Sequence, residues 1–192
     1  MSGYKLYKNF IRDPRTTGIV VPSSRHLAHE MTSGVGIENA SSIIEIGPGT
    51  GSFTSLIRER MRPGTRYFAV EINRELCDSF ALRFPDMKIF NRDAAHLREI
   101  MDGEGMSHAD LIVSGLPWAS LPLSVQDNVL NAISSTMSPH GCFTTYAYIQ
   151  GFMLPAAHRF RNRLKDHFRH ISTSRVVWRN LPPAFAYRCR RG

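Results

Sequence analysis

The sequence predicts a single α/β domain built on a mostly parallel sheet. Short apolar runs rich in β-branched residues alternate with longer segments of helical spacing, which is the pattern of strand–helix–strand units. The chain has 192 residues, about the length of one domain. Hydrophobic residues make up 42% and charged residues 21%, so the composition excludes a disordered or low-complexity chain. We therefore expect one core, with helices on both faces of the sheet.

Seven apolar runs are predicted to be strands. The first reads SIIEI, a nearly continuous apolar run that is typical of a strand buried on both faces. The last two flank Leu181-Pro182-Pro183, a gap too short for a helical crossover, so we expect them to pair antiparallel. The predicted strands are residues 42–46, 67–71, 87–91, 109–113, 141–149, 171–178 and 185–190.

Six segments, one before the first of these runs and five between them, have helical spacing. In the last one, Phe160, Leu164 and Phe168 recur every four residues, and we expect this stripe to pack on the sheet. The stretch 128–157 is almost free of charge, but proline, glycine and many polar residues interrupt it, so we expect no membrane span there. The predicted helices are residues 23–33, 52–61, 73–84, 95–101, 123–137 and 155–168.

A further helix is predicted over residues 4–12, ahead of the domain. Its aromatic residues and its cations lie on different sides of the helical wheel, and Pro14 ends it. A short, aromatic and cationic helix suits the headgroup layer of a membrane. We therefore divide the chain into residues 1–21, a membrane-docking or lid segment, and residues 22–192, the main domain. The side chains of this helix that are expected to contact a membrane are Tyr4, Lys5, Tyr7, Lys8 and Arg12.

The net charge of +8 is unevenly distributed. Residues 1–31 and 151–192 are basic, whereas residues 32–150 carry more acids than bases. Basic ends on an acidic middle favour an anionic partner, either nucleic acid or anionic lipid. The alternative is a solvated basic surface without a partner.

The cysteines and histidines give no sign of a metal site or of export. Three scattered cysteines suit a reducing cytoplasm rather than a disulfide framework or a zinc site. The N-terminus has no apolar core of signal-peptide length. Among the eight histidines, His26 and His29 lie three apart on a predicted helix, which is weak evidence for a metal pair. We expect no metal.

The run Glu45 to Gly51, EIGPGTG, ends the first predicted strand and leads into a helix. Its glycines allow the backbone to turn sharply and to approach a ligand closely. Glu71 ends the second strand, where an acid can accept two hydrogen bonds from a ribose diol. Asp93 follows the third strand and can accept from an adenine amino group. With the turn at Ser114, these features lie at the C-terminal ends of strands, where open α/β sheets bind ligands.

Each feature also has a simpler interpretation. The glycines alone can form a tight turn, Glu71 can be a solvated strand end, and Asp93 can cap a helix. The combination at this spacing favours a ligand that carries a ribose and an adenine.

Together these motifs resemble those of the class I S-adenosylmethionine-dependent methyltransferases. The glycine run of this chain has the spacing GxGxG, which fits that family better than it fits the nicotinamide enzymes, whose spacing is GxGxxG. The resemblance implies a Rossmann-like fold, with a seven-stranded mostly parallel sheet and an antiparallel last strand. It also implies S-adenosylmethionine as cofactor and S-adenosylhomocysteine as product. The cofactor-binding residues that follow are Glu45, Gly47, Pro48, Gly49, Thr50, Gly51, Glu71, Ile72, Asp93, Ala94, Ser114, Gly115 and Leu116.

The turn Ser114 to Trp118, SGLPW, resembles the acceptor motif of amino-methylating enzymes. In ribosomal RNA adenine dimethylases an asparagine leads this motif and accepts a hydrogen bond from the target amine, while the aromatic residue stacks on the flipped base. Ser114 is a shorter and weaker group, which argues against adenine as acceptor. An RNA adenine N6-methyltransferase stays open because the basic C-terminal segment permits it, with nucleic acid as the less expected partner.

A second resemblance spans nearly the whole chain. DPRTTGIVVPSS from Asp13, EIGPGTG, SGLPW, and WRNLPPAF from Trp178 resemble segments of the bacterial phospholipid N-methyltransferases. These enzymes convert phosphatidylethanolamine stepwise toward phosphatidylcholine, and a related branch acts on ornithine lipids. The resemblance implies a cytoplasmic enzyme, peripheral on the inner face of the membrane, with the anionic membrane surface and phosphatidylethanolamine as partners. A non-catalytic membrane-surface protein is the third function left open, and the intact cofactor motif argues against it.

The lipid acceptor would be a primary amine that is protonated at neutral pH. Freeing its lone pair costs roughly 4–5 kcal/mol, so the site must release a proton and align nitrogen, methyl and sulfur. Tyr146 and Tyr148 are the candidate catalytic residues that face the headgroup, and we expect only one of them to reach the site. Trp118 is expected to line the site beside the cofactor, with core packing as the alternative. Arg15 and Arg179 are the expected lipid-phosphate contacts.

Overall fold

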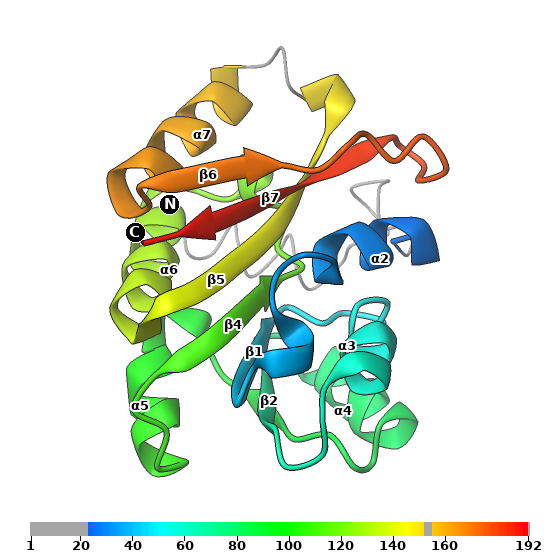
Figure 1. Ribbon diagram of the computed structural model, residues 1–192, viewed down its shortest axis with the longest axis vertical. Helices are drawn as coiled ribbons and strands as arrows, with labels where there is room; N and C mark the ends of the chain where they lie inside the picture. Colours follow the sequence, from blue (N-terminus) through cyan, green and yellow to red (C-terminus); the bar gives the residue numbers. More distant parts are fainter. Residues whose placement is uncertain (1–22, 152–154, 192) are drawn as a thin grey trace.

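The computed structural model describes residues 23–151 and 155–191, which form a seven-stranded sheet flanked by helices (Figure 1). The strand order is β3-β2-β1-β4-β5-β7-β6. Strands β1 to β5 pair with one another in parallel, and β7 is antiparallel to both β5 and β6, which confirms the predicted sheet. The strands are β1 (Ser42–Ile46), β2 (Arg66–Glu71), β3 (Ile89–Asn91), β4 (Ala109–Ser114), β5 (Met137–Tyr148), β6 (His170–Thr173) and β7 (Ala184–Arg190).

Helices cover both faces of the sheet, as predicted (Figure 1). Helices α2, η1, α3 and α4 pack on one face, and η2, α5, α6 and α7 pack on the other. The predicted helix over residues 4–12 lies outside the described residues. The helices are α2 (Arg25–Thr32), η1 (Ile37–Asn39), α3 (Thr54–Arg60), α4 (Arg74–Arg83), η2 (Ala94–His96), α5 (Leu97–Gly103), η3 (Trp118–Ser120), α6 (Leu123–Thr136), η4 (Ile149–Gly151) and α7 (Pro155–His167).

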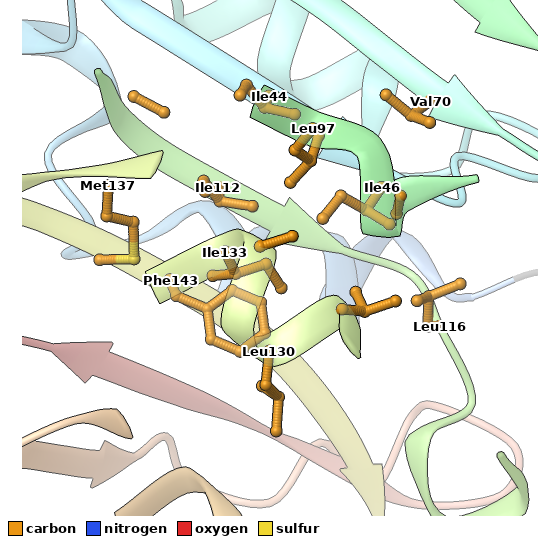
Figure 2. Packing of buried hydrophobic residues seen from close by; sticks show 14 of the residues in the cluster. Ile44, Ile46, Val70, Leu97, Ile112, Leu116, Leu130, Ile133, Met137 and Phe143 are labelled. Carbon is orange, nitrogen blue, oxygen red and sulfur yellow. The ribbon is translucent and has the colours of Figure 1, made fainter. Parts of the chain in front are cut away.

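The central strands are buried on both faces because successive side chains point to opposite sides of a sheet. Ile44 and Ile46 pack with Ile112 and Phe143 on the α5–α6 side, where Figure 2 shows the cluster. Ile43 faces α2 and α3 instead. All five side chains are at most 1% exposed. This double burial explains why the first strand reads as a nearly continuous apolar run.

The apolar stripe of α7 packs on the sheet, which confirms its predicted role. Phe160, Leu164 and Phe168 are at most 3% exposed, and the Phe168 ring stacks on Phe143 with centroids 5.6 Å apart. Within the described residues, none of the helices combines the length and the apolar character that crossing a bilayer requires.

The predicted strand 171–178 is wrong in its second half, because β6 ends at Thr173. Thr173 pairs with Tyr187, but the next bridge joins Val177 to Ala184, so the β6 side has one more residue than β7 between these pairs. Such an insertion is a β-bulge, which bends the strand and twists it away from its partner. The chain therefore leaves the sheet before Trp178, whose side chain is 71% exposed.

Candidate functional site

The C-terminal ends of β1, β2 and β4 meet at one edge of the sheet. Ile46 of β1 pairs with Val70 of β2 on one side and with Ser114 of β4 on the other. The Gly47 N–H donates to the Val70 carbonyl and the Gly115 N–H donates to the Ile46 carbonyl, both at 2.8 Å. These bonds continue the parallel ladders past the strand ends. They bring the glycine loop, residues 47–53, against the SGLPW turn, as the sequence predicts.

The glycines of this edge serve different purposes. A Cβ atom on Gly51 would lie 2.3 Å from the Phe84 ring, and one on Gly115 would lie 2.3 Å from the Gly47 carbonyl oxygen. These two glycines are therefore needed for packing between protein segments. A Cβ on Gly49 would meet no atom within 4 Å, although φ there is +53°. Gly49 thus has a backbone conformation that favours glycine, beside open space that a ligand can occupy.

Glu71 ends β2 directly beside the glycine loop. Its Oε1 accepts from the Asn73 N–H at 3.0 Å, and its carboxylate also accepts from the backbone of Gly49 and Ile72. Only 6% of the residue is exposed, and this burial raises the pKa of the carboxyl. The carboxylate is therefore fixed in orientation where the loop turns, as a ribose-binding acid requires.

Asn91 was not among the expected site residues, yet it fixes the turn after Glu71. Its Nδ2 donates to the backbone carbonyls of Glu71 and Ile72, both at 3.0 Å. The only signal in the sequence is a polar residue at the end of an apolar strand. Polar residues end many strands that are far from any site, so this signal is weak.

Asp93 caps a helix, the simpler of its two interpretations. Its Oδ1 accepts from the Ala95 N–H at 2.9 Å at the start of η2. Ala94 beside it is 8% exposed and belongs to the core. The residue still lies at the C-terminal edge of β3, and its contact with adenine remains a prediction.

Glu45 lies beneath the glycine loop rather than on its surface. The side chain is 0% exposed, and its Oε2 accepts from the Thr54 hydroxyl at 2.9 Å and from the Tyr67 hydroxyl at 2.6 Å. Burial raises the pKa of this carboxyl to about 7. Because Thr54 is the first residue of α3, the bond ties the start of α3 to β1. Glu45 is thus placed to position the loop, and the sequence alone did not single out Thr54 or Tyr67.

Ser114 and Trp118 turn inward at the corner where the acceptor was expected. The Ser114 hydroxyl accepts from the Leu116 N–H at 3.3 Å and from the Trp118 Nε1–H at 3.2 Å, and Ser114 is 0% exposed. The Trp118 ring is 2% exposed and stacks on Phe160 with centroids 5.0 Å apart. The structure thus places Trp118 in the core, as in the alternative interpretation. Leu116, at 7% exposure, packs against Gly47.

Tyr146 and Tyr148 lie on the same face of the sheet, so the expectation that strand alternation lets only one of them face the site is wrong in its premise. Residues two apart in a strand share a face, and both rings lie on the α2–α3 side, 5.4 Å apart in a T-shaped contact. Tyr146 also contacts Phe53 of the glycine loop, with centroids 5.9 Å apart. Both are half-buried, and burial raises the pKa of Tyr146, so its hydroxyl keeps its proton at neutral pH.

The expected lipid contacts are only partly described. Arg179 is exposed in the loop between β6 and β7. The six candidates from the N-terminal segment lie outside the described residues: Tyr4, Lys5, Tyr7, Lys8, Arg12 and Arg15. In the described part of the chain, no three His, Cys, Asp or Glu side chains are grouped so that they could hold a metal ion.

No family model matches the chain. The ornithine lipid N-methyltransferase of Singulisphaera acidiphila is 30% identical over 185 residues, which cover 94% of this chain and 92% of that protein. The ribosomal RNA small subunit methyltransferase A of Methylococcus capsulatus is 32% identical over 122 residues, which cover 60% of this chain but only 40% of that protein. The O-methyltransferase TomG of Streptomyces achromogenes, solved with SAM, is 14% identical and has a TM-score of 0.67 over 97% of this chain and 89% of that one, which shows a shared fold.

The strand order and the glycine loop, together with a relative that matches over nearly the full length, define the class. The chain belongs to the class I S-adenosylmethionine-dependent methyltransferases, and S-adenosylmethionine is its cofactor. Within this class, it belongs to the same family as the ornithine lipid N-methyltransferase of Singulisphaera acidiphila.

The described residues fit this cofactor. The open space beside Gly49 admits a ligand close to the backbone, and the adjoining Glu71 carboxylate suits a ribose diol. The cofactor supplies a methyl group on a sulfonium, which is already electrophilic. The protein must therefore bring an acceptor into line with this methyl group.

Proposed function

We propose that this methyltransferase N-methylates the amine headgroup of a membrane lipid, acting from the cytoplasmic face of an anionic membrane. Phosphatidylethanolamine is the acceptor that the sequence resemblance favours, with its methylated intermediates leading toward phosphatidylcholine. The supporting observation is the similarity to a lipid N-methyltransferase along 94% of the chain. Because that relative is named for ornithine lipid, this lipid is the second candidate acceptor.

The geometry of the SGLPW turn argues against an adenine acceptor. A flipped base needs a polar side chain to accept from its amino group and an aromatic ring to stack on. Ser114 and Trp118 stand at those positions, but both are buried and bonded to each other. The RNA methyltransferase relative, moreover, matches over only 60% of this chain.

Tyr146 and Tyr148 are our candidates for the acceptor side of the site. A phenol that keeps its proton is a poor base, so we assign Tyr146 to orientation rather than to proton removal. The faces of both rings can attract an ammonium group, which suits an acceptor that becomes a methylated cation. Tyr146→Leu should therefore raise KM for the lipid more than it lowers cofactor affinity.

The function is tested by methyl transfer from labelled S-adenosylmethionine to three acceptors in parallel. These are phosphatidylethanolamine in anionic vesicles, ornithine lipid in the same vesicles, and unmodified ribosomal RNA. We expect label in a lipid and none in RNA, with phosphatidylethanolamine as the better acceptor. Label in RNA alone would contradict the proposal. Label in ornithine lipid alone would support lipid N-methylation but would show that ornithine lipid, not phosphatidylethanolamine, is the acceptor.

A further inference from the structure

We infer that the loop between β6 and β7, residues 174–183, is a docking surface that inserts Trp178 and Leu181 into the headgroup region of an anionic membrane. The inference rests on the proposed lipid function and adds to it the part of the described fold that contacts the bilayer. It is independent of the helix predicted for residues 4–12.

Two large apolar side chains of this loop are exposed. Trp178 is 71% exposed and Leu181 is 76% exposed, only three residues further on. Single exposed leucines are common in soluble proteins, and Leu82 on α4 is one of them at 86%. A neighbouring tryptophan and leucine are different, because tryptophan is enriched where a membrane meets water.

A buried polar residue fixes the loop in place. Asn180 is 3% exposed, its Nδ2 donates to the Pro182 carbonyl at 2.7 Å, and its Oδ1 accepts from the Ser24 N–H at 2.9 Å. Val177, 7% exposed, bridges to Ala184 of β7. The fold therefore presents Trp178 and Leu181 outward on an ordered loop, so docking costs little additional ordering.

The loop also lies on the cofactor side of the sheet. Ala184, the first residue of β7, pairs with Tyr148 at the end of β5, so the loop leaves the sheet at the edge where the parallel strands end. The cofactor loop lies at this same edge, and Figure 1 shows the β6–β7 loop projecting past α2. A bilayer bound there would offer its headgroups to the side of the protein that carries the methyl donor.

The loop also carries positive charge. Arg175, whose side chain is 88% exposed, and Arg179 flank Trp178, and together with His26 and His29 they line a groove of about 400 Å³ between the loop and α2. Glu30 is the acid in this groove, and its carboxylate is paired with Arg175 at 3.3 Å and with Arg188 at 3.2 Å. The loop therefore presents cations around its apolar tip, the combination that anionic headgroups attract.

Intrinsic fluorescence tests the inference in the full-length protein, because the chain has two tryptophans and Trp118 is buried. On addition of vesicles of phosphatidylethanolamine and phosphatidylglycerol, we expect the emission to shift to shorter wavelength and acrylamide quenching to fall. Trp178→Phe should abolish both changes. If the wild type co-sediments with the vesicles but its emission and quenching do not change, the inference is overturned.

Matched variants provide the second test. Trp178→Ala with Leu181→Ser should lower vesicle affinity at least tenfold, whereas Leu82→Ser, which removes a similarly exposed leucine on α4, should leave it unchanged. Arg179→Gln should lower vesicle affinity about fivefold, and this loss should be smaller at high salt because salt screens the attraction between the arginine and the headgroups. Equal affinity of the double variant and the wild type would contradict the docking surface.

Comparing methylation of lipid in detergent micelles with methylation in vesicles tests the docking surface separately from the proposed function. In micelles the double variant should methylate lipid as the wild type does, and on vesicles it should lose most of its activity. If the wild type methylates no lipid even in micelles, the proposed function fails. If the double variant is as active as the wild type on vesicles, only the docking surface fails.

Discussion

The glycine loop and the β6–β7 loop leave the same edge of the sheet, but they are built in opposite ways. The glycine loop depends on missing side chains: Phe84 packs 2.3 Å from where a Cβ of Gly51 would lie, and the Gly47 carbonyl lies 2.3 Å from where a Cβ of Gly115, in the SGLPW turn, would lie. The β6–β7 loop is fixed by the buried Asn180 side chain and by the bridge from Val177 to Ala184, and it carries large side chains that remain exposed. The first design brings backbone close to a small ligand. The second presents apolar and cationic groups to a surface.

The comparison predicts its largest effect at Gly51. Gly51→Ala adds a Cβ 2.3 Å from the Phe84 ring, at a φ of +77° that L residues rarely adopt. Overpacking and backbone strain together should lower the free energy of unfolding by about 3 kcal/mol or more. Urea unfolding monitored by circular dichroism measures this loss. A loss below about 1 kcal/mol would mean that Phe84 moves aside easily.

Glu45 should make stability depend on pH. Its folded pKa of about 7 lies above the ordinary value of 4.5, so the folded protein retains a proton that the unfolded chain has released. The free energy of unfolding should therefore fall by about 3 kcal/mol as pH rises from about 4.5 to 7. Glu45→Gln should remove this dependence, as unfolding at several pH values in this range would reveal. A slope equal to that of the wild type would contradict the assignment.

Gly49 and Glu71 should affect ligand binding more than folding. Glu71→Ala should weaken S-adenosylmethionine about tenfold to a hundredfold, through loss of two hydrogen bonds to the ribose. Gly49→Ala should weaken it as well while costing about 1 kcal/mol of stability, since its Cβ meets only open space. Calorimetric titration measures both affinities. Unchanged affinity in Glu71→Ala would remove the ribose assignment.

The smallest effect is expected at Ser114. Ser114→Ala removes the acceptor of the Trp118 Nε1–H, so stability should fall by about 1 kcal/mol while methyl transfer to lipid stays near the wild-type rate. Thermal unfolding and initial rates test the two parts. A large loss of kcat at unchanged stability would show that Ser114 acts on the acceptor after all.

The fold could be predicted from the sequence because its signals are local. The conformation of each signal follows from its own residues, as in SIIEI, the glycine run and the short gap before the last strand. The bulge between Thr173 and Val177 could not be predicted, because it depends on pairing with β7. Within the site, EIGPGTG and Glu71 identified the cofactor edge. The hydrogen bonds of Glu45 to Tyr67 and of Asn180 to Ser24 join residues that are distant in the sequence, so they could not be predicted from local signals. Tyr146 and Tyr148 share a face because they lie two residues apart in β5.

The lipid product itself reports whether this edge of the sheet methylates a lipid amine. The wild type and Glu71→Ala are incubated with S-adenosylmethionine and phosphatidylethanolamine vesicles, and the extracted lipid is fragmented by mass spectrometry. We expect methyl groups on the headgroup fragment with the wild type and far fewer with the variant. A headgroup that stays unmethylated, or methylation that does not depend on Glu71, would contradict it.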